Sequence, residues 1–457
     1  MSPILGIGNA FGMLKNRYGE HFHTSFRDVS DVAGKYLQGL FQSSKKNMER
    51  MEEVVPGSDP QALHHFISNS PWNEKPLLMQ IGNDANHLLG NSLNSCLLID
   101  ETGFVKKGNH SAGVSRQWCG QVGKVENSQV GVFSVICNGK HATAVDYRLY
   151  LPESWLDSVD WQKRCNDGKI PSEYQVYKSK RELALELVES ARANGMGFNW
   201  IGADGFYGME SSFLYKLEAM GESFMIDVHK DRIVYLEDPA PQVPETKPGH
   251  LGRHFSRLKP QVEGEKVCDW VNEQPESAWR RVEVRASSKG KLKVDILHKR
   301  VWIWDSDLQE SEAHLWHLVV RREVNSPHKI KYSLSNAPQE TSLHRLAFMQ
   351  AQRYWVERSF QNGKSQCGMG DYQVRSWVGW HHHMAMVLLA MLLMMEQYWL
   401  HRGSIPLLSY RDIVILLVAT LQKRDIMPQE IMRQLRKRHR KRLSAIKSHK
   451  KRQMEVV

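Results

Sequence analysis

Two short apolar runs, each ending in an aspartate, constrain the fold of this chain more than any other feature. The first, SCLLID, ends at Asp100, and the second, FNWIGAD, ends at Asp204. Glycine and polar residues typical of a loop follow both runs, so each predicts a buried strand with a carboxylate at its tip. If the two strands lie side by side in one sheet, both carboxylates emerge at the same edge.

The text between and after these runs predicts further strands and helices. QVGVFSVIC (129–137) and ATAVDYRLYL (142–151) are strand-like, and the Asn138-Gly139 pair between them is a strong hairpin signal. KSKRELALELVESARA (178–193) has apolar residues at helical spacing, a second helix is expected over 210–220, and SFMIDV is strand-like. The expected order is β-β-β-α-β-α-β, which indicates an α/β core with a mixed sheet.

The sequence pattern divides the chain into five expected regions. Residues 1–92 are mostly helical and are expected to form a small N-terminal helical domain, to which the family resemblance described below assigns DNA binding, and 93–230 hold the first part of the core. Residues 231–341 alternate in the manner of strands and predict a β-rich insertion. The pattern returns to helix over 342–402, the second part of the catalytic core, and 403–457 form a helical region with a basic tail.

The excess positive charge lies at one end of the chain. The formal net charge is +11, and the stretch 433–452 alone holds eleven Lys or Arg and no acid. A concentrated basic run is a solvated tail or the footprint of contact with phosphates or an anionic membrane surface. We favour nucleic acid, with Arg436, Lys437, Arg438, Arg440, Lys441 and Arg442 as DNA-binding residues.

The cysteines, the N-terminus and the apolar runs indicate the cellular compartment. The six cysteines form no CxxC pair, which fits a reduced, cytoplasmic compartment. The N-terminus does not resemble a secretory signal. The most apolar run, MAMVLLAMLLMM (384–395), is shorter than the about 20 residues that span a bilayer, so we expect a buried helix and no membrane partner.

The candidate chemistry rests on three acids. Strand cleavage of DNA without a covalent protein intermediate uses two divalent cations about 4 Å apart, and Mg²⁺ prefers carboxylate oxygens. Asp100, Asp204 and Glu357, the last on an expected helix, could supply them. Each aspartate could instead be a turn former. Four acids are rival candidates for a ligand position: Glu101, Asp146, Asp227 and Asp371.

Two basic residues share the face of the helix that carries Glu357. Arg353 precedes Glu357 by four residues and Lys364 follows it by seven, so all three point to roughly one side. Such residues could grip the phosphates of a scissile strand. Alternatively, Arg353 and Glu357 form an ordinary surface ion pair.

Several long blocks resemble the insertion-sequence transposases of the 701 family. They are LLIDETGFVKKGNHSAGVSRQWCGQVGKVENSQVGVF, RLYLPESW, GADGFYG and YWVERSFQNGKSQCGMGDYQVRSWVGWHHH, in order between about Leu97 and His383. That family is related to a wider group with a ribonuclease-H-like core and a β insertion before the third acid. The resemblance implies this fold and a metal-binding, catalytic triad of Asp100, Asp204 and Glu357.

The resemblance also implies the activity and partners. It implies a DDE transposase that excises an insertion sequence by phosphodiester hydrolysis and joins it to new DNA by transesterification, with Mg²⁺ or Mn²⁺ as cofactor. The partners would be double-stranded DNA, as terminal inverted repeats and target, and a second copy of the chain in a homodimer. The setting would be the bacterial cytoplasm, with nucleoid association when DNA is bound.

Arg353 and Lys364 match the arginine and lysine of the wider group's Y-R-E-K signature, but Gln350 stands where its tyrosine is expected. A tryptophan of the insertion can stack on a flipped base in that group. The available residues are Trp270, Trp279, Trp302, Trp304 and Trp316.

Two other functions remain open. A domesticated transposase would bind DNA without cutting it, and the three intact acids count against this. A ribonuclease-H-like nuclease would cut without joining, and the β insertion and extra DNA-binding regions favour transposition over it.

Overall fold

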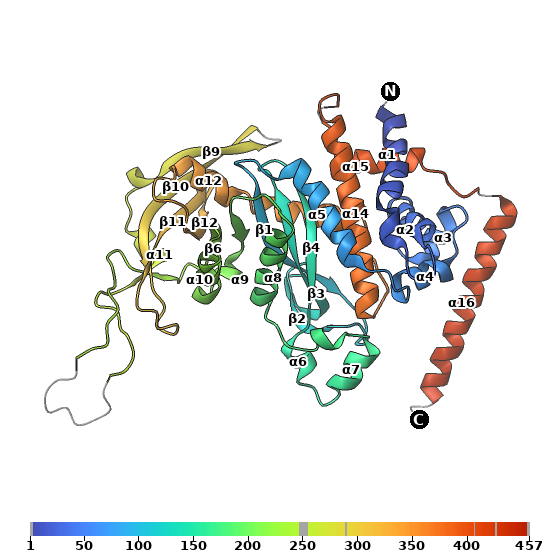
Figure 1. Ribbon diagram of the computed structural model, residues 1–457, viewed down its shortest axis with the longest axis horizontal. Coiled ribbons are helices and arrows are strands. Elements are labelled where there is room, and N and C mark those ends of the chain that lie inside the picture. Colours follow the sequence, from blue (N-terminus) through green and yellow to red (C-terminus); the bar gives the residue numbers. More distant parts are fainter. Residues whose placement is uncertain (1–2, 246–254, 288–289, 406, 426, 455–457) are drawn as a thin grey trace. The chain divides into compact units, whose positions relative to one another are not determined.

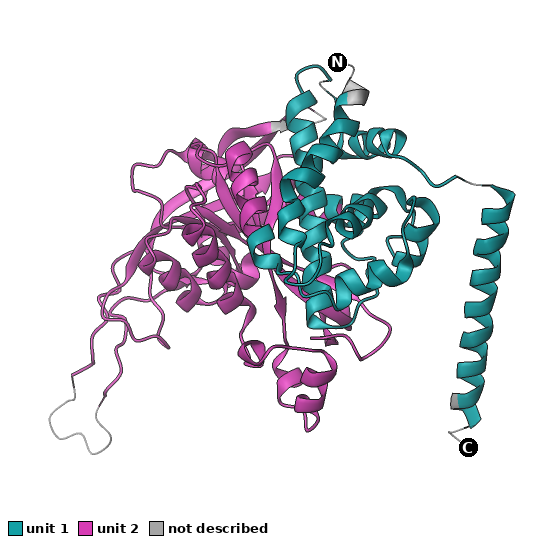
Figure 2. Ribbon diagram, turned by 45° about the vertical axis from the view of Figure 1, so that its right-hand side comes forward, with its two compact units in different colours: residues 1–77, 362–457 teal, residues 78–361 magenta. Residues whose placement is uncertain are grey.

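The computed structural model describes residues 3–245, 255–287, 290–405, 407–425 and 427–454 (Figure 1). The chain divides into two compact units (Figure 2). Unit 1 holds residues 1–77 and 362–457, and unit 2 holds residues 78–361. The N-terminal and C-terminal helices, which belong to separate ranges in the sequence, therefore share one unit.

Unit 2 is built on a ten-stranded mixed sheet. The strand order is β2-β3-β1-β5-β6-β12-β11-β10-β9, with β4 paired to β3. The first four strands are β1 (Cys96–Val105), β2 (Ser115–Cys119), β3 (Lys124–Cys137) and β4 (Ala142–Tyr150). The predicted hairpin joins β3 to β4, and Gly139 takes the left-handed conformation there with φ of 88°.

Parallel strands continue the sheet on the other side of β1. β5 (Ile201–Ala203) pairs parallel with β1, and β6 (Phe224–Val228) pairs parallel with β5. The predicted crossover helix is α8 (Lys180–Ala193), whose capping box at Ser179 fixes its start and which packs on β3 and β4. The other connecting elements are α6 (Glu153–Leu156), α7 (Trp161–Asp167), η2 (Ser172–Tyr174), α9 (Gly205–Gly208) and α10 (Ser211–Ala219).

The β-rich insertion extends the same sheet. β12 pairs antiparallel with β6, with Ser333 opposite Asp227, and β11, β10 and β9 follow in order. The elements are β7 (Ile233–Val234), β8 (Glu265–Lys266), α11 (Val267–Asn272), η3 (Glu276–Ala278), β9 (Arg280–Ser287), β10 (Gly290–Ile303), β11 (His314–Glu323) and β12 (Ser326–Ser335). The expected mixed α/β fold is confirmed, and the insertion is continuous with the core sheet through one strand pair.

Two local expectations are wrong. Asp100 lies in the middle of β1 and not at its tip, because the long strand β3 pairs with every residue of β1 as far as Val105. The expected helix around Glu357 is two helices, α12 (Leu343–Ala351) and α13 (Tyr354–Gln366). Arg353 lies in the break between them.

Unit 1 is helical and encloses α14 (Trp377–His401). Polar atoms on this helix find partners within the unit: His382 lies between the carbonyl oxygens of Ile67 and Trp72, and His383 hydrogen-bonds Tyr36 at 2.8 Å. The other elements are α1 (Pro3–Tyr18), η1 (Gly19–Phe22), α2 (Ser30–Gln42), α3 (Met48–Val54), α4 (Pro60–Ser68), α15 (Tyr410–Thr420) and α16 (Pro428–Met454); α5 (Glu74–Leu89) crosses the boundary between the units.

One helix of the described chain, α14, is long and apolar enough to cross a membrane by length and composition alone. Within its most apolar window, 94% of the helix is buried inside the protein. Burial of this kind is what the core helix of a folded domain shows, in agreement with the expectation from the run 384–395.

Gly208 of the GADGFYG motif lies against the backbone of β6, which predicts the effect of a substitution there. A Cβ added at Gly208 would overlap the backbone oxygen of Asp227 on β6, whereas one at Gly205 would meet no atom closer than 3.9 Å. We expect Gly208→Ala to lower the free energy of unfolding by about 2 kcal/mol or more, since overpacking against backbone cannot relax by a rotamer change. Gly205→Ala is the matched control, with little change expected in urea denaturation. Equal stability of the two variants would contradict this packing.

Candidate active site

The three predicted acids of the site meet around a single guanidinium group. Nη1 of Arg353 lies 3.6 Å from Oδ2 of Asp100 and 3.9 Å from Oδ2 of Asp204. Nη2 of Arg353 donates a hydrogen bond to Oε1 of Glu357 at 3.0 Å. Three carboxylates far apart in the sequence are therefore held within reach of one side chain.

Strand pairing brings the two aspartates together. β1 and β5 run parallel with Leu98 opposite Gly202, so Asp100 and Asp204 each stand two residues beyond one matched pair. Asp204 also caps α9, because its Oδ1 accepts the Phe206 amide at 3.0 Å. This bond fixes one oxygen of Asp204 and turns the other toward Arg353.

Glu357 comes to the site from a helix. It lies in the first turn of α13, and Phe360, one turn further on, packs edge-to-face on Phe133 of β3 with ring centroids 5.5 Å apart. This contact places α13 across β3, the neighbour of β1. The Glu357 side chain is 60% exposed, in contrast to 14% for Asp100, so it is the most accessible acid of the three.

Burial and neighbouring acids raise the pKa values of the two aspartates of the site. Burial and the nearby Asp204 carboxylate raise the pKa of Asp100 well above its usual value. Burial and Glu101 likewise raise the pKa of Asp204. Burial alone would lower the pKa of Arg353, but the surrounding acids raise it. The ionised form of both aspartates is therefore disfavoured in this site.

The donor set suits a hard divalent cation. Asp100, Asp204 and Glu357 supply carboxylate oxygens, the ligands that Mg²⁺ and Mn²⁺ prefer. Among the residues that the structure describes, no three acidic, histidine or cysteine side chains are already clustered closely enough to hold a metal. The Arg353 guanidinium stands between the carboxylates, so these acids fit the chemistry of a metal site once the arginine gives way.

The four rival acids differ in their partners and in their place in the fold. Glu101 is held by Lys180 and Tyr207, each at 2.9 Å, and Asp146 by Arg148 at 3.0 Å. Asp371 belongs to unit 1. Only Asp227 of β6 joins the cluster, with its Oδ2 3.2 Å from Nε of Arg353. The sequence signal for Asp227 was an acid inside the apolar run SFMIDV.

Gln350, which replaces the expected tyrosine, is a buried structural residue. It is 4% exposed, and its Nε2 donates to the carbonyl of Val319 at 3.1 Å and to the hydroxyl of Ser333 at 2.8 Å. It therefore links α12 to β11 and β12, and it does not present a ring for stacking.

The sequence matches a family model over more than half of its length. A model described as DDE superfamily endonuclease matches residues 20–291. The chain belongs to the DDE superfamily of endonucleases. The matched range holds Asp100, Asp204 and Asp227 and ends before Arg353 and Glu357.

A curated relative of the chain is named as a probable transposase. It is named a probable transposase for insertion sequence element IS701, from Microchaete diplosiphon, and is 28% identical over 226 residues, covering 48% of this chain and 54% of the relative. The chain thus spans about half the length of that relative. Together with the family model, this match confirms the resemblance drawn from the sequence blocks.

Solved structures show only a distant likeness. A piggyBac transposase synaptic complex with hairpin DNA aligns at 10% identity with a TM-score of 0.38, covering 87% of this chain and 72% of that one. The NurA nuclease from Sulfolobus solfataricus aligns at 11% identity with a TM-score of 0.22, covering 60% and 79%. Both TM-scores are too low to establish a shared fold.

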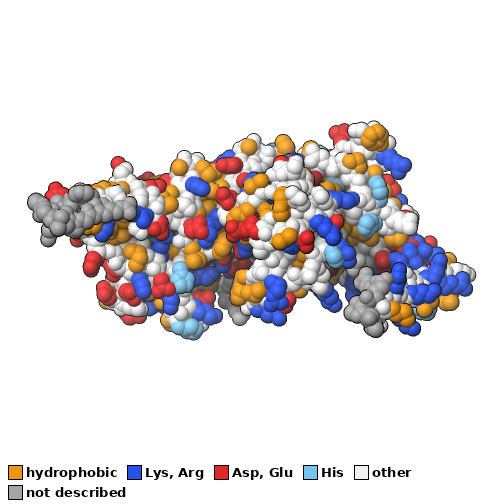
Figure 3. All heavy atoms as spheres, turned by 90° about the horizontal axis from the view of Figure 1, so that it is seen from below, with side chains coloured by type: hydrophobic (Ala, Val, Ile, Leu, Met, Phe, Trp, Pro, Cys, Tyr) orange, Lys and Arg blue, Asp and Glu red, His pale blue; other side chains and the backbone are white. Residues whose placement is uncertain are grey.

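The six basic residues of α16 that the sequence predicts to bind DNA fall into two groups, and blue side chains crowd this helix at the right of Figure 3. One group pairs with acids of α3: Lys437 with Glu52 at 3.0 Å, Arg438 with Glu53 at 2.7 Å, and Lys441 with Glu49. The other group has no ion pair within 4 Å among the described residues and consists of Arg436, Arg440 and Arg442.

The tryptophans suggested for base stacking are mostly core. Trp270, Trp304 and Trp316 are buried, and Trp279 lies under the Arg322 guanidinium with 4.2 Å to its ring centroid. Trp302 is half-buried. Sequence reasoning missed Trp118, which lies on the β2–β3 hairpin and is 60% exposed.

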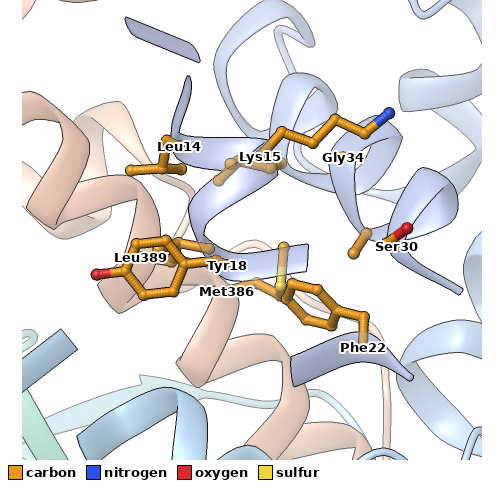
Figure 4. Close-up of a pocket in the computed structure, with 10 residues that line it drawn as sticks. Leu14, Lys15, Tyr18, Phe22, Ser30, Gly34, Met386 and Leu389 are labelled. Atoms are coloured by element: carbon orange, nitrogen blue, oxygen red, sulfur yellow. The ribbon is translucent and has the colours of Figure 1, made fainter. Parts of the chain in front are cut away.

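A small pocket of about 10 Å³ lies in unit 1 (Figure 4). Its walls are mainly apolar side chains of α1, η1, α2 and α14, such as Leu14, Phe22 and Leu389. The Lys15 ammonium at its edge pairs with Asp31 at 3.1 Å. It offers no group suited to phosphodiester chemistry.

The raised pKa of Asp100 has a consequence for stability. Because its pKa is higher in the folded than in the unfolded chain, the ionised carboxylate weakens the fold at neutral pH, and this cost disappears as pH falls through the folded pKa. We expect Asp100→Asn to raise Tm at pH 7.5 by about 2–4 °C, the shift that ~1 kcal/mol gives in a domain of this size. The difference should close on acidification.

Asp146→Asn is the contrasting control. Its carboxylate pairs with Arg148 and accepts from Ser190, so its loss should lower Tm. Differential scanning calorimetry between pH 5 and 8 measures both variants. A lower Tm for Asp100→Asn at pH 7.5 would contradict the strain assigned to this carboxylate.

Proposed function

We propose that this protein is a DNA transposase that excises and inserts a mobile element by metal-dependent phosphodiester hydrolysis and transesterification. The observation that carries the proposal is the convergence of Asp100, Asp204 and Glu357 on one guanidinium, in a chain of the DDE superfamily. The named function of the relative from Microchaete diplosiphon supports it.

Asp100, Asp204 and Glu357 would hold Mg²⁺ or Mn²⁺. The bound cations would activate the attacking oxygen and stabilise the leaving oxygen of the phosphodiester. Asp100 and Asp204 must be ionised for this, so cation binding should release protons where their pKa is raised. Glu357, the exposed member, lies where DNA can reach it.

Basic side chains near the triad would orient the DNA. Arg353 touches all three acids, and Lys364 lies on α13 two turns beyond Glu357. A guanidinium suits bidentate contact with a phosphate. We assign both residues to the scissile strand, as the expected helix face suggested.

The strands β4, β3, β1, β5 and β6 would form a ribonuclease-H-like core. Their order, with β3 antiparallel and β1, β5 and β6 parallel, supports this assignment. Residues 231–341 would be the insertion characteristic of the wider transposase group, and 1–92 and 403–457 would hold the DNA ends. A homodimer on terminal inverted repeats, in the bacterial cytoplasm, completes the proposal.

The first experiment compares wild type with Glu357→Gln on DNA that carries the element's own ends. We expect wild type to cut and join with Mg²⁺ or Mn²⁺, and the variant to lose both activities by well over about 100-fold, because it loses a metal ligand. DNA affinity, measured by gel shift without metal, should be unchanged.

The controls separate the alternatives. Glu323→Gln, which alters a β11 carboxylate outside the cluster, should retain activity. Wild type that binds the ends but neither cuts nor joins would indicate a DNA-binding protein. Cutting without joining would indicate a nuclease.

A second experiment tests α16. We expect Arg436→Gln/Arg440→Gln/Arg442→Gln to weaken binding to any duplex and to reduce the salt slope of log K by up to about 2–3, since each phosphate contact contributes ~0.9. Lys437→Gln/Lys441→Gln should have a smaller effect, because these lysines are paired with Glu52 and Glu49. Equal effects per charge in the two variants would contradict this division of α16.

A further inference from the structure

Arg353 is held from two sides at the candidate active site. Its terminal nitrogens face the triad, and Nη1 is no closer than 3.6 Å to either aspartate. Its Nε faces Asp227 at 3.2 Å, an ion pair in which the N–H does not point directly at the carboxylate. Asp227 is thus the only one of the four contacting acids outside the triad.

Asp227 is fixed by a chain of hydrogen bonds that does not involve the triad. The Ser333 hydroxyl on β12 donates to Oδ1 of Asp227 at 2.6 Å, in the register where these residues face each other. Gln350 on α12 in turn donates to the Ser333 hydroxyl and to the Val319 carbonyl. The insertion strands and α12 therefore set the position of this carboxylate.

The charges around Arg353 explain why a fourth acid is needed. At the observed separations of 3.0–3.9 Å, each carboxylate attracts the partly buried guanidinium. Cations bound to Asp100, Asp204 and Glu357 would cancel that attraction and repel Arg353. The Asp227 carboxylate would still hold it. Lys331 and Arg321, which interact electrostatically with Asp227, also lie on this side.

We propose that Asp227 is a positioning residue that anchors Arg353 through Nε, so that the triad can exchange the guanidinium for metal while the arginine stays beside the scissile phosphate. This inference rests on the proposed metal-binding function of the triad. It assigns to the Gln350–Ser333–Asp227 chain the task of tying the insertion strands to the catalytic arginine.

The experiment measures Mn²⁺ binding to the full-length protein, by electron paramagnetic resonance, and then single-turnover cleavage. Without its anchor, Arg353 competes more strongly for the triad. We expect Asp227→Asn to weaken Mn²⁺ binding by about 10-fold. Arg353→Gln should strengthen it, and adding Asp227→Asn to Arg353→Gln should cause little further change, since the anchored group is gone.

Cleavage at saturating Mn²⁺ gives a second readout. Asp227→Asn and Arg353→Gln should slow it to a similar extent, and the double variant should be no slower than either. Asp231→Asn is the matched control, because this exposed acid follows the same strand and forms an ion pair with His229 at 3.0 Å, outside the triad. It should behave as wild type.

The outcomes are distinguishable. An equal loss of Mn²⁺ affinity on adding Asp227→Asn to wild type and to Arg353→Gln would overturn the anchoring role and make Asp227 a ligand or a structural residue. Wild-type affinity in Asp227→Asn would overturn it as well. If wild type binds no Mn²⁺, or Glu357→Gln binds it equally well, the proposed function of the triad fails instead.

Discussion

The contact of four carboxylates with one guanidinium is the interaction on which the rest of this structure depends. Asp100, Asp204, Asp227 and Glu357 all contact Arg353. Like charges at such separations repel by several kcal/mol in a partly buried setting. The fold must therefore supply the opposite charge or leave acids protonated, and burial together with the neighbouring acids raises the pKa values of Asp100 and Asp204 despite the nearby Arg353.

The strand order of the sheet brings these carboxylates close together. β1, β5 and β6 are parallel neighbours, and each carries an aspartate at or just beyond the paired segment. Gly208 lets α9 lie directly on the backbone of β6, which keeps the end of β5 against Asp227. On the far side, β12 joins β6 and supplies Ser333. The insertion thus supports the site structurally, through backbone pairing and one hydroxyl.

Local patterns could suggest Asp100, Asp204 and Glu357 as candidates, and the family resemblance selected them over the rival acids. Apolar runs, turn residues and helical spacing are encoded within a few residues. Asp227 could be named only as a rival, since its role depends on pairing between β6 and β12, far apart in the chain. The break before α13 escaped prediction for a similar reason: Gln350 contacts Val319 and Gln352 contacts Cys137, and helical periodicity does not report such long-range contacts.

Charge also limits how DNA can approach. Under the proposed function, a site with four acids would repel a polyanion until cations occupied it, so affinity for DNA would have to come from elsewhere on the chain. α16 supplies positive charge, but the acids of α3 already engage Lys437, Arg438 and Lys441. Those ion pairs fix one face of the helix and leave Arg436, Arg440 and Arg442 exposed. The acids of α3 therefore set the orientation of α16, and under the proposed function the arginines that they do not reach would supply its contacts with DNA.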